Sequence, residues 1–549
     1  MRPADRLRAL LLGLLLWLPG LATPLLAEGL DLGESLAVLL LSLFVLAVPL
    51  CLLQRLKLYF LLWLPLIPLI PVYVFLCAYY RSVPGDVLVS AALHSSLRDA
   101  WTMVASFGWM LLWVPACVVV YLVLLVGLGS EARWRWRRAT LAGVLLYAMV
   151  GMLGRQDLAH YVKLPPLFDN QAASLVFPLN LVLSVQRSLE RDRQDRAMAS
   201  VQGRSESTEP MLVVLVIGES VRRDHLSLNG YARPTTPRLD SRRQELVSFS
   251  DAVSTAQWTA GAVPRLVSWE APEGRASLVQ TFREAGFKTA WLSNQEVSDL
   301  SRQADVLDHS TSAAELYFRK DISLLPPFES FVRQGGDRRF VVLHMMGSHF
   351  PYEDRYAADA RQFRPTLTDA GISGQPQVSH RLETINSYDN TLVALDQFLA
   401  RLIDSLRTQA GPALLIYTSD HGEALFEGEG GKLFMHGRPV PSCMDLDVPL
   451  IIWSNEAYRR QRGEAVAALR AHVDKRISHQ DLFATTLDLA GVRWSGEAAG
   501  SSFASPGFVE RPRPVQAFLG SPATTYEAVC PARPALRPSS RPTPPAPRR

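Results

Sequence analysis

Charged residues are missing from five long stretches in the first 154 residues of this 549-residue chain. None of them contains Asp, Glu, Lys or Arg, and they span residues 9–27, 35–54, 58–80, 100–130 and 139–154. A helix needs about 20 apolar residues to cross a bilayer core, so four stretches are long enough or nearly so, and the last is short. Buried helices of a soluble protein rarely stay uncharged over such lengths. The sequence therefore predicts an N-terminal bundle of five transmembrane helices.

Basic residues gather on alternate sides of these stretches. They precede the first, separate the second from the third, and separate the fourth from the fifth: Arg2, Arg6 and Arg8; Arg55 and Lys57; Arg133, Arg135, Arg137 and Arg138. The loop 28–34 has acids and no bases, and 81–99 is balanced. By the positive-inside rule the N-terminus is cytoplasmic and everything after Gly154 is exported. Residues 9–27 alone would suit a signal peptide, but four further spans favour an uncleaved helix.

The absence of ionisable groups within the stretches also argues against a transporter, because ion and proton pathways usually need them. The formal net charge is only +4. Much of the basic excess lies in the loops that set the orientation, so we expect a lipid bilayer as partner and no nucleic acid.

Cysteine is scarce, with five in the chain. Cys51, Cys77 and Cys117 lie in the apolar stretches. Cys443 and Cys530 lie in the exported half, where oxidising conditions would allow them to pair. Sequence gives no distance between two cysteines, so their pairing stays open.

Composition divides the chain into four parts. A transmembrane domain (1–154) is followed by an interfacial helix and linker (155–209), a soluble domain (210–525) and a Pro/Arg-rich tail expected to be disordered (526–549). In the third part, short apolar runs alternate with helix-like stretches such as 381–408; the runs are 211–218, 288–293, 339–347, 413–419 and 448–453. This alternation predicts an α/β fold with a mainly parallel central sheet covered on both faces.

Acidic and imidazole side chains follow several of these runs. Glu219 follows the first, Asp420 and His421 follow the fourth, and His349 follows the third. Ligands in such sheets bind beyond the carboxyl ends of the strands. Carboxylate oxygen and histidine nitrogen are ligands that zinc accepts, so we expect a zinc site at this edge.

A candidate nucleophile lies in QWTAGAVPRL, residues 257–266. A threonine hydroxyl is a poor nucleophile unless a base or a metal lowers its pKa. Zinc held by Glu219, Asp420 and His421 would leave one position for a hydroxyl. Residue types and spacing alone do not favour Thr259 over Thr255 or Ser254.

Several motifs follow one another in the third part of the chain: VVLVIGESVRRDHLSLNGYARPTTPRL (213–239), TAQWTAGAVPRL (255–266), LHMMGSHFPY (343–352), SYDNT (387–391), YTSDHGEALFEGE (417–429), MHG (435–437) and DVPLIIWSN (447–455). In this order they resemble the motifs of the bacterial phosphoethanolamine transferases, which belong to the alkaline-phosphatase and sulfatase superfamily. The resemblance covers roughly 210–505, and the five preceding spans also match the family's architecture. It implies an alkaline-phosphatase-like catalytic domain.

The resemblance implies specific roles for individual residues. Thr259 falls on the catalytic nucleophile, and the zinc ligands fall on Glu219, Thr259, Asp420 and His421. One zinc ion is expected, and a second is left open. The expected substrate-binding residues are His349, His436, Asn294 and Gln295.

The implied reaction moves phosphoethanolamine from phosphatidylethanolamine to lipopolysaccharide or a periplasmic glucan through a phosphothreonine intermediate, at the bacterial inner membrane with the catalytic domain periplasmic. The family's lipid A enzymes carry cysteines beside the nucleophile, where this chain has Thr255 and Arg265. In this respect the chain resembles the family's cysteine-poor branch, whose members modify lipopolysaccharide core sugars or periplasmic glucans. The alternatives are a glycerol-phosphate transferase of the lipoteichoic acid synthase type and a sulfatase or phosphatase.

Overall fold

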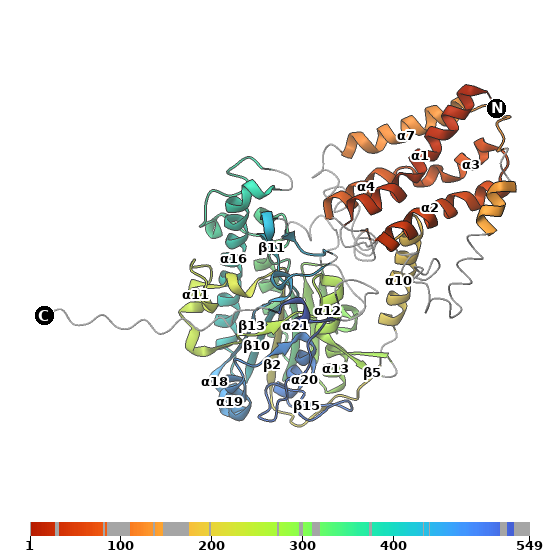
Figure 1. Ribbon diagram of the computed structural model, residues 1–549. Coiled ribbons are helices and arrows are strands. Elements are labelled where there is room, and N and C mark those ends of the chain that lie inside the picture. The colour runs from red at the N-terminus through yellow and green to blue at the C-terminus, as the bar shows by residue number, and fades with distance from the viewer. Residues whose placement is uncertain are drawn as a thin grey trace. The chain divides into compact units, whose positions relative to one another are not determined.

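The computed structural model describes residues 2–27, 32–80, 83–84, 110–134, 138–145, 175–196, 199–271, 274–295, 300–309, 319–372, 376–431, 433–438, 440–516 and 524–531. The chain forms two compact units, Met1–Arg191 and Asp192–Arg549, and Figure 1 shows the elements of each. The predicted loop 81–99 lies almost entirely outside the described residues, as does the predicted tail from residue 532.

The first unit consists of apolar helices. They are α1 (Pro3–Leu26), α2 (Leu32–Leu52), α3 (Leu56–Trp63), α4 (Leu69–Tyr80) and α7 (Met110–Gly127). Helices α1 and α2 are long and apolar enough to cross a membrane, and the pair α3 and α4, bent by 56°, makes a third span if it is one crossing. The five-helix bundle is therefore not confirmed. Its expected fifth span continues past residue 145, beyond the described residues.

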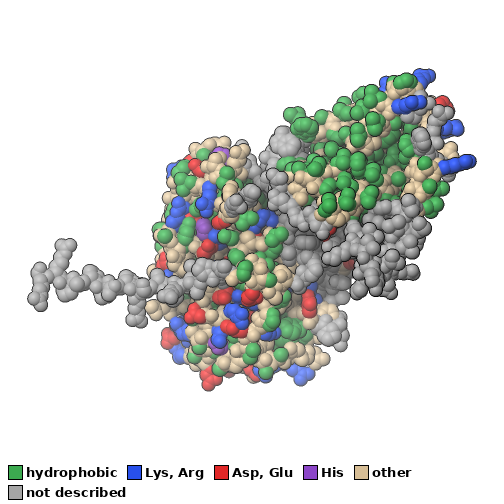
Figure 2. All heavy atoms as spheres, viewed as in Figure 1, with side chains coloured by type: hydrophobic (Ala, Val, Ile, Leu, Met, Phe, Trp, Pro, Cys, Tyr) green, Lys and Arg blue, Asp and Glu red, His purple; other side chains and the backbone are tan. Residues whose placement is uncertain are grey.

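Polarity in this unit is inverted relative to a soluble domain. Hydrophobic side chains cover much of its visible surface in Figure 2, and Leu10 and Val123 are 59% and 66% exposed. Polar groups pair inside, where the hydroxyls of Thr23 and Tyr73 lie 3.0 Å apart. Such a surface suits lipid better than water.

Helix α10 (Leu179–Arg196) lies within the range 155–209 that was predicted to hold an interfacial helix and a linker. Its first residues are apolar, and its second half reads QRSLERDRQDR.

A seven-stranded sheet organises the second unit, in the order β3-β13-β10-β2-β9-β7-β8. The strands are β2 (Met211–Gly218), β3 (Leu246–Ser248), β7 (Lys288–Ser293), β8 (Val306–His309), β9 (Arg338–His344), β10 (Ala413–Ser419) and β13 (Leu450–Ser454). The strands from β10 to β8 pair in parallel, whereas β13 pairs antiparallel with β10 and β3. The sheet is thus mixed, with a parallel core as predicted. The predicted strands 211–218, 288–293 and 413–419 have the observed bounds.

Helices cover both faces of this sheet, and Figure 1 shows α16 on one side with α12 and α13 on the other. One core combines alternate β2 side chains with α12 (Thr259–Val267), α13 (Leu278–Glu284) and α20 (Leu482–Leu489). The other core combines the intervening side chains with α15 (Leu325–Arg333) and α16 (Arg381–Arg407). Every residue of β2 is buried, which explains its continuous apolar sequence.

Smaller elements surround this core. The helices are α11 (Pro237–Asp240), α17 (Cys443–Leu446), α18 (Glu456–Gln461), α19 (Gly463–Ala471) and α21 (Tyr526–Val529). The strands are β1 (Arg204–Ser205), β4 (Ala252–Val253), β5 (Ser268–Ala271), β6 (Gly274–Ser277), β11 (Ala424–Glu427), β12 (Leu433–Met435), β14 (Ile477–Ser478), β15 (Val492–Arg493), β16 (Pro514–Val515) and β17 (Thr524–Thr525).

The chain remains packed as far as Cys530. Cys443 and Cys530 form a disulfide between α17 and the end of α21, which resolves the open question of their pairing. Tyr526 is only 2% exposed and packs with Val253 and Leu446. These contacts and the disulfide hold α21, which begins at the predicted tail boundary of 526, on the folded unit.

Candidate metal centre and nucleophile

Glu219 lies directly after the carboxyl end of β2 and is fully buried. The loop that follows β9 approaches its backbone closely at Gly347. A Cβ atom on Gly347 would lie 2.6 Å from the carbonyl oxygen of Glu219 and 2.7 Å from its nitrogen, and the φ of Gly347 is +47°. Only glycine permits this approach. The glycine at position 347 therefore allows the loop after β9 to pack against Glu219 at the end of β2.

Asp420 and His421 lie beside Glu219 because β10 runs parallel to β2, with Ser419 opposite Gly218. His421 Nε2 is 3.4 Å from Glu219 Oε1 and 3.4 Å from Asp420 Oδ2. His421 Nδ1 donates to the carbonyl oxygen of Gly422 at 2.8 Å. That hydrogen bond leaves Nε2 available as a ligand, as is usual for histidines that bind metals.

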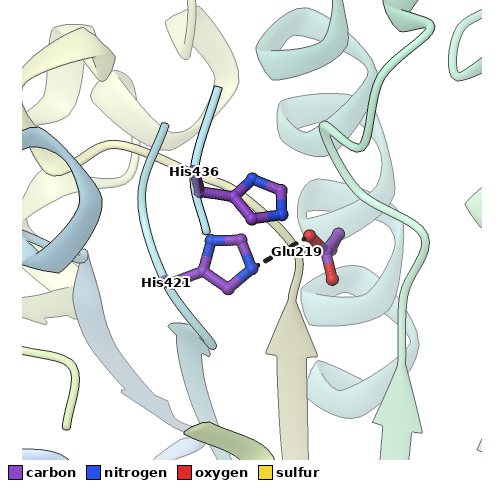
Figure 3. A group of neighbouring side chains, drawn as sticks. All are labelled: Glu219, His421 and His436. Carbon is purple, nitrogen blue, oxygen red and sulfur yellow. Dashed lines mark ion pairs between the residues drawn. The ribbon is translucent and has the colours of Figure 1, made fainter. Parts of the chain in front are cut away.

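A hairpin of β11 and β12 brings His436 to the same place. Its ring centroid is 4.1 Å from that of His421, and its Nδ1 is 3.1 Å from Glu423 Oε2. Figure 3 shows Glu219, His421 and His436 pointing toward one another above the end of β2. Ligand atoms of these three residues lie within 4.8 Å of one another, so His436 belongs to the group that could hold a metal ion.

The donor set fits a divalent cation. In the described part of the chain, Asp420 Oδ2 and His421 Nε2 are buried and lack a hydrogen-bond partner. Orphaned buried polar atoms are costly unless something binds them. Carboxylate oxygens and imidazole nitrogens with oriented Nδ1 atoms are ligands typical of zinc.

Mutual electrostatics set the protonation of the metal-free cluster. Burial opposes ionisation of Glu219, but His421 and the other neighbouring histidines outweigh it and hold the pKa of Glu219 below its usual range. Burial, then the charge of Glu219, raises the pKa of Asp420 to about 8. Burial disfavours a charged His421, but Asp420 and Glu219 raise its pKa to about 9. At neutral pH the metal-free cluster therefore holds two protons that a cation must displace.

Thr259 is the first residue of α12, and its hydroxyl donates to Glu219 Oε2 at 2.9 Å. The two alternatives differ in their contacts. Ser254 donates to the carbonyl oxygens of Ala256 and Asp420, and Thr255 Oγ1 is buried without a partner in the described residues. Of the three hydroxyls, Thr259 is the one with a described hydrogen bond to a side-chain carboxylate of the cluster, and the positive end of α12 favours negative charge there.

The other predicted residues divide into two groups. His349 lies near the centre, with its ring centroid 6.3 Å from that of His436 and its Nδ1 donating to the Phe350 carbonyl oxygen at 2.7 Å. Gln295 Nε2 donates to Glu219 Oε2 at 3.0 Å. Asn294 instead donates to Asp321 at 2.9 Å and makes no described contact with the cluster.

Burial sets the protonation of two of the neighbouring histidines. It lowers the pKa of His349. Burial and then His421 lower the pKa of His436 to about 3. Both rings are therefore neutral near pH 7, which suits them to bind a cation or accept a proton.

Two further residues of the site were missed. Glu423 is fully buried beside His436, with its Oε1 lacking a partner in the described residues. Ser220 donates to Glu219 Oε1 at 2.6 Å. Each belongs to a motif already quoted, DHGE and GES, so position next to a proposed ligand was the available signal.

A family comparison agrees with this geometry. A family model described as Sulfatase matches residues 211–492, which include the seven-stranded sheet and the GES and DHGE motifs. The chain belongs to the sulfatase family.

Individual proteins similar to this chain carry more specific names than the family model. The phosphoethanolamine transferase EptC of Escherichia coli K12 is 28% identical over 337 residues, which cover 57% of this chain and 56% of that protein. The chain thus matches little more than half the length of this curated relative. The periplasmic domain of Escherichia coli EptC, solved in complex with Zn, is 26% identical with a TM-score of 0.54, covering 61% of this chain and 98% of that one.

One solved structure resembles this chain over most of its length, including the N-terminal helices. The integral membrane protein lipooligosaccharide phosphoethanolamine transferase A of Neisseria meningitidis has a TM-score of 0.69 at 21% identity, covering 91% of this chain and 96% of that one. At this identity the likeness is one of fold. It agrees with an alkaline-phosphatase-like unit joined to N-terminal apolar helices.

Proposed function

We propose that this chain is a zinc-dependent phosphoethanolamine transferase. It moves phosphoethanolamine from phosphatidylethanolamine to lipopolysaccharide or a periplasmic glucan. The names of the similar proteins, and the zinc bound to one of them, support this proposal. It is carried by one observation, the 2.9 Å hydrogen bond from the Thr259 hydroxyl to the carboxylate of Glu219, beside Asp420 and His421.

Glu219, Asp420, His421 and Thr259 would hold the zinc, with His436 close enough to join them. Bound zinc supplies Lewis-acid chemistry, which favours an ionised hydroxyl and neutralises a phosphoryl oxygen. Thr259 is placed for attack because its proton already points at Glu219 Oε2. The N-terminal end of α12 also favours a phosphate there through the helix dipole.

The reaction has two displacements at phosphorus. Thr259 Oγ forms a bond to phosphorus, the bond to the diacylglycerol oxygen breaks, and that oxygen leaves with a proton. An acceptor hydroxyl or phosphate then attacks phosphorus, and Thr259 regains its proton as the bond to it breaks. His349, neutral by burial, carries protons between the attacking and leaving oxygens.

Glu423 gives a reason to favour an ethanolamine headgroup over glycerol. Its carboxyl group is fully buried, and its Oε1 has no partner among the described residues. Burial raises its pKa to about 8, so the carboxyl group is mainly neutral at pH 7. A neutral carboxyl group is expected where a buried carboxylate lacks its cation. The ammonium of ethanolamine supplies such a charge, whereas glycerol does not.

The N-terminal helices belong to the same proposal. Five spans, with a cytoplasmic N-terminus, would tether a periplasmic catalytic unit to the inner membrane. The donor is a lipid, so tethering raises the effective concentration of site and donor.

The test is a transfer assay with the full-length chain in detergent, zinc and phosphatidylethanolamine, with lipopolysaccharide or periplasmic glucan as acceptor. We expect diacylglycerol to be released and the acceptor to gain phosphoethanolamine. Phosphatidylglycerol in place of the donor distinguishes the glycerol-phosphate alternative, since a product carrying glycerol phosphate would contradict the proposal. Free phosphoethanolamine with no modified acceptor would indicate a hydrolase.

A further inference from the structure

Ser220, next to Glu219, has a backbone conformation unusual for its residue type. Its φ is +58°, in the left-handed region where the Cβ atom crowds the backbone. The residue is fully buried. Glycine would adopt this conformation without strain, so a serine here calls for a reason in its side chain.

The polar atoms of Ser220 are all engaged. Its backbone nitrogen donates to Asp420 Oδ1 at 3.2 Å, and its carbonyl oxygen accepts from the Tyr388 hydroxyl at 2.7 Å. The same hydroxyl accepts from the backbone nitrogen of Arg222 at 2.9 Å. Glycine could make both backbone contacts of Ser220, so these contacts alone do not require a side chain.

The serine hydroxyl adds one contact that glycine cannot make. Ser220 Oγ donates to Glu219 Oε1 at 2.6 Å. The other oxygen, Oε2, accepts from Thr259 at 2.9 Å and from Gln295 at 3.0 Å. Donors therefore fix both oxygens of this carboxylate before any cation binds, and Ser220 alone touches both Glu219 and Asp420 among these donors.

We infer that Ser220 is a positioning residue of the metal centre, whose hydroxyl orients the Glu219 carboxylate for a divalent cation. This inference rests on the proposed zinc site. Groups that hydrogen-bond to a ligand orient it, and their loss typically weakens metal affinity about tenfold to a hundredfold. The left-handed backbone is retained because Tyr388 and Asp420 hold it from both sides.

The experiment measures the zinc dissociation constant of the full-length chain in detergent by competition with a chromophoric chelator. Two variants separate the hydroxyl from the backbone: Ser220→Ala removes the hydroxyl and keeps the strain, and Ser220→Gly removes both. Gln202→Gly is the matched control, because exposed Gln202 also has a positive φ of 51°, outside the cluster. The visible absorption spectrum of the cobalt-substituted chain is the second readout, since it reports ligand geometry without activity.

We expect both Ser220 variants to bind zinc about tenfold to a hundredfold more weakly, with altered cobalt spectra, and Gln202→Gly to match the wild type. Wild-type affinity in Ser220→Gly would overturn the inference, whatever Ser220→Ala does, because the hydroxyl would then be dispensable. If Ser220→Ala fails to fold, Ser220→Gly carries the test alone. A wild-type chain that binds no zinc would instead overturn the proposed metal centre itself.

Discussion

Two clusters of buried charged groups in the second unit differ in whether their polar atoms are paired. Around Asp389, which is fully buried, His225 Nδ1 lies at 2.8 Å, Arg233 donates at 2.8 Å and Tyr231 donates at 3.0 Å. Around Glu219, Asp420 Oδ2 and His421 Nε2 lie 3.4 Å apart, and neither atom has a hydrogen-bond partner within the described residues. Both clusters are enclosed by the same fold, so burial alone does not distinguish them.

The difference indicates what each cluster does. A buried carboxylate with three donors is satisfied and ties the loop after β2 to α16, so its role is structural. Buried oxygen and nitrogen atoms that face one another without a hydrogen bond can be satisfied by a further charge, and a divalent cation supplies it. Pairing, rather than burial or residue type, thus separates a structural cluster from a candidate metal centre.

The largest effect is expected at the unpaired cluster. Thr259→Ala should reduce diacylglycerol release from phosphatidylethanolamine on the order of 10⁴-fold or more, because the attacking oxygen is lost. Thr255→Ala is the matched control, since Thr255 Oγ1 has no partner in the described residues. Equal losses in both variants would mean that the segment, rather than one hydroxyl, is needed.

At the paired cluster the expected effect falls on stability. Asp389→Ala leaves His225 and Arg233 without their common carboxylate and should lower the free energy of unfolding by about 3 kcal/mol. Urea unfolding followed by tryptophan fluorescence measures this change. Zinc affinity of the folded variant should match the wild type, and a large loss of affinity would erase the distinction between the clusters.

The control for that experiment is Asp404→Ala, which removes the exposed partner of Arg242. Surface pairs contribute little, so this variant should unfold at nearly the wild-type urea concentration.

The disulfide should contribute about as much to the free energy of unfolding as Asp389. It closes a sequence separation of 87 residues, and replacing both Cys443 and Cys530 with serine should cost about 2–4 kcal/mol of unfolding free energy. The backbone of α17 also contacts the loop that follows β10, because Gly422 N donates to the Asp445 carbonyl oxygen at 2.7 Å. Unchanged unfolding of the double variant under oxidising conditions would contradict a stabilising role.

The last expected effect is that of pH on metal binding. In the metal-free chain the pKa of Asp420 is about 8 and that of His421 about 9. Both groups hold a proton below pH 8, so zinc affinity should rise with pH, most steeply below 8, and level off above 9. Chelator competition from pH 6 to 9 measures this, with proton release followed in weakly buffered solution. Affinity independent of pH would mean that neither proton is displaced.

Local sequence predicted the sheet core well and placed three candidate metal ligands at one edge of the sheet. Continuous apolar runs predicted β2, β7 and β10 with their observed bounds, because buried parallel strands need apolar residues on both faces. Glu219, Asp420 and His421 could be placed together because parallel strands end at the same edge of a sheet.

Long-range contacts could not be predicted in this way. A hairpin carries His436 to the metal cluster, and Gln295 reaches Glu219 from the loop after β7. The left-handed Ser220 has no sequence signal, since its conformation depends on Tyr388 and Asp420. The pairing of Cys443 with Cys530 likewise depended on a distance that only the fold sets.

The most direct test of the central claim is mass spectrometry of the full-length chain after incubation with zinc and phosphatidylethanolamine, without an acceptor. The account predicts a phosphoethanolamine adduct on the wild-type chain that maps to Thr259 by peptide sequencing and is absent from Thr259→Ala. An adduct that persists in Thr259→Ala, or that maps to another residue, would contradict it.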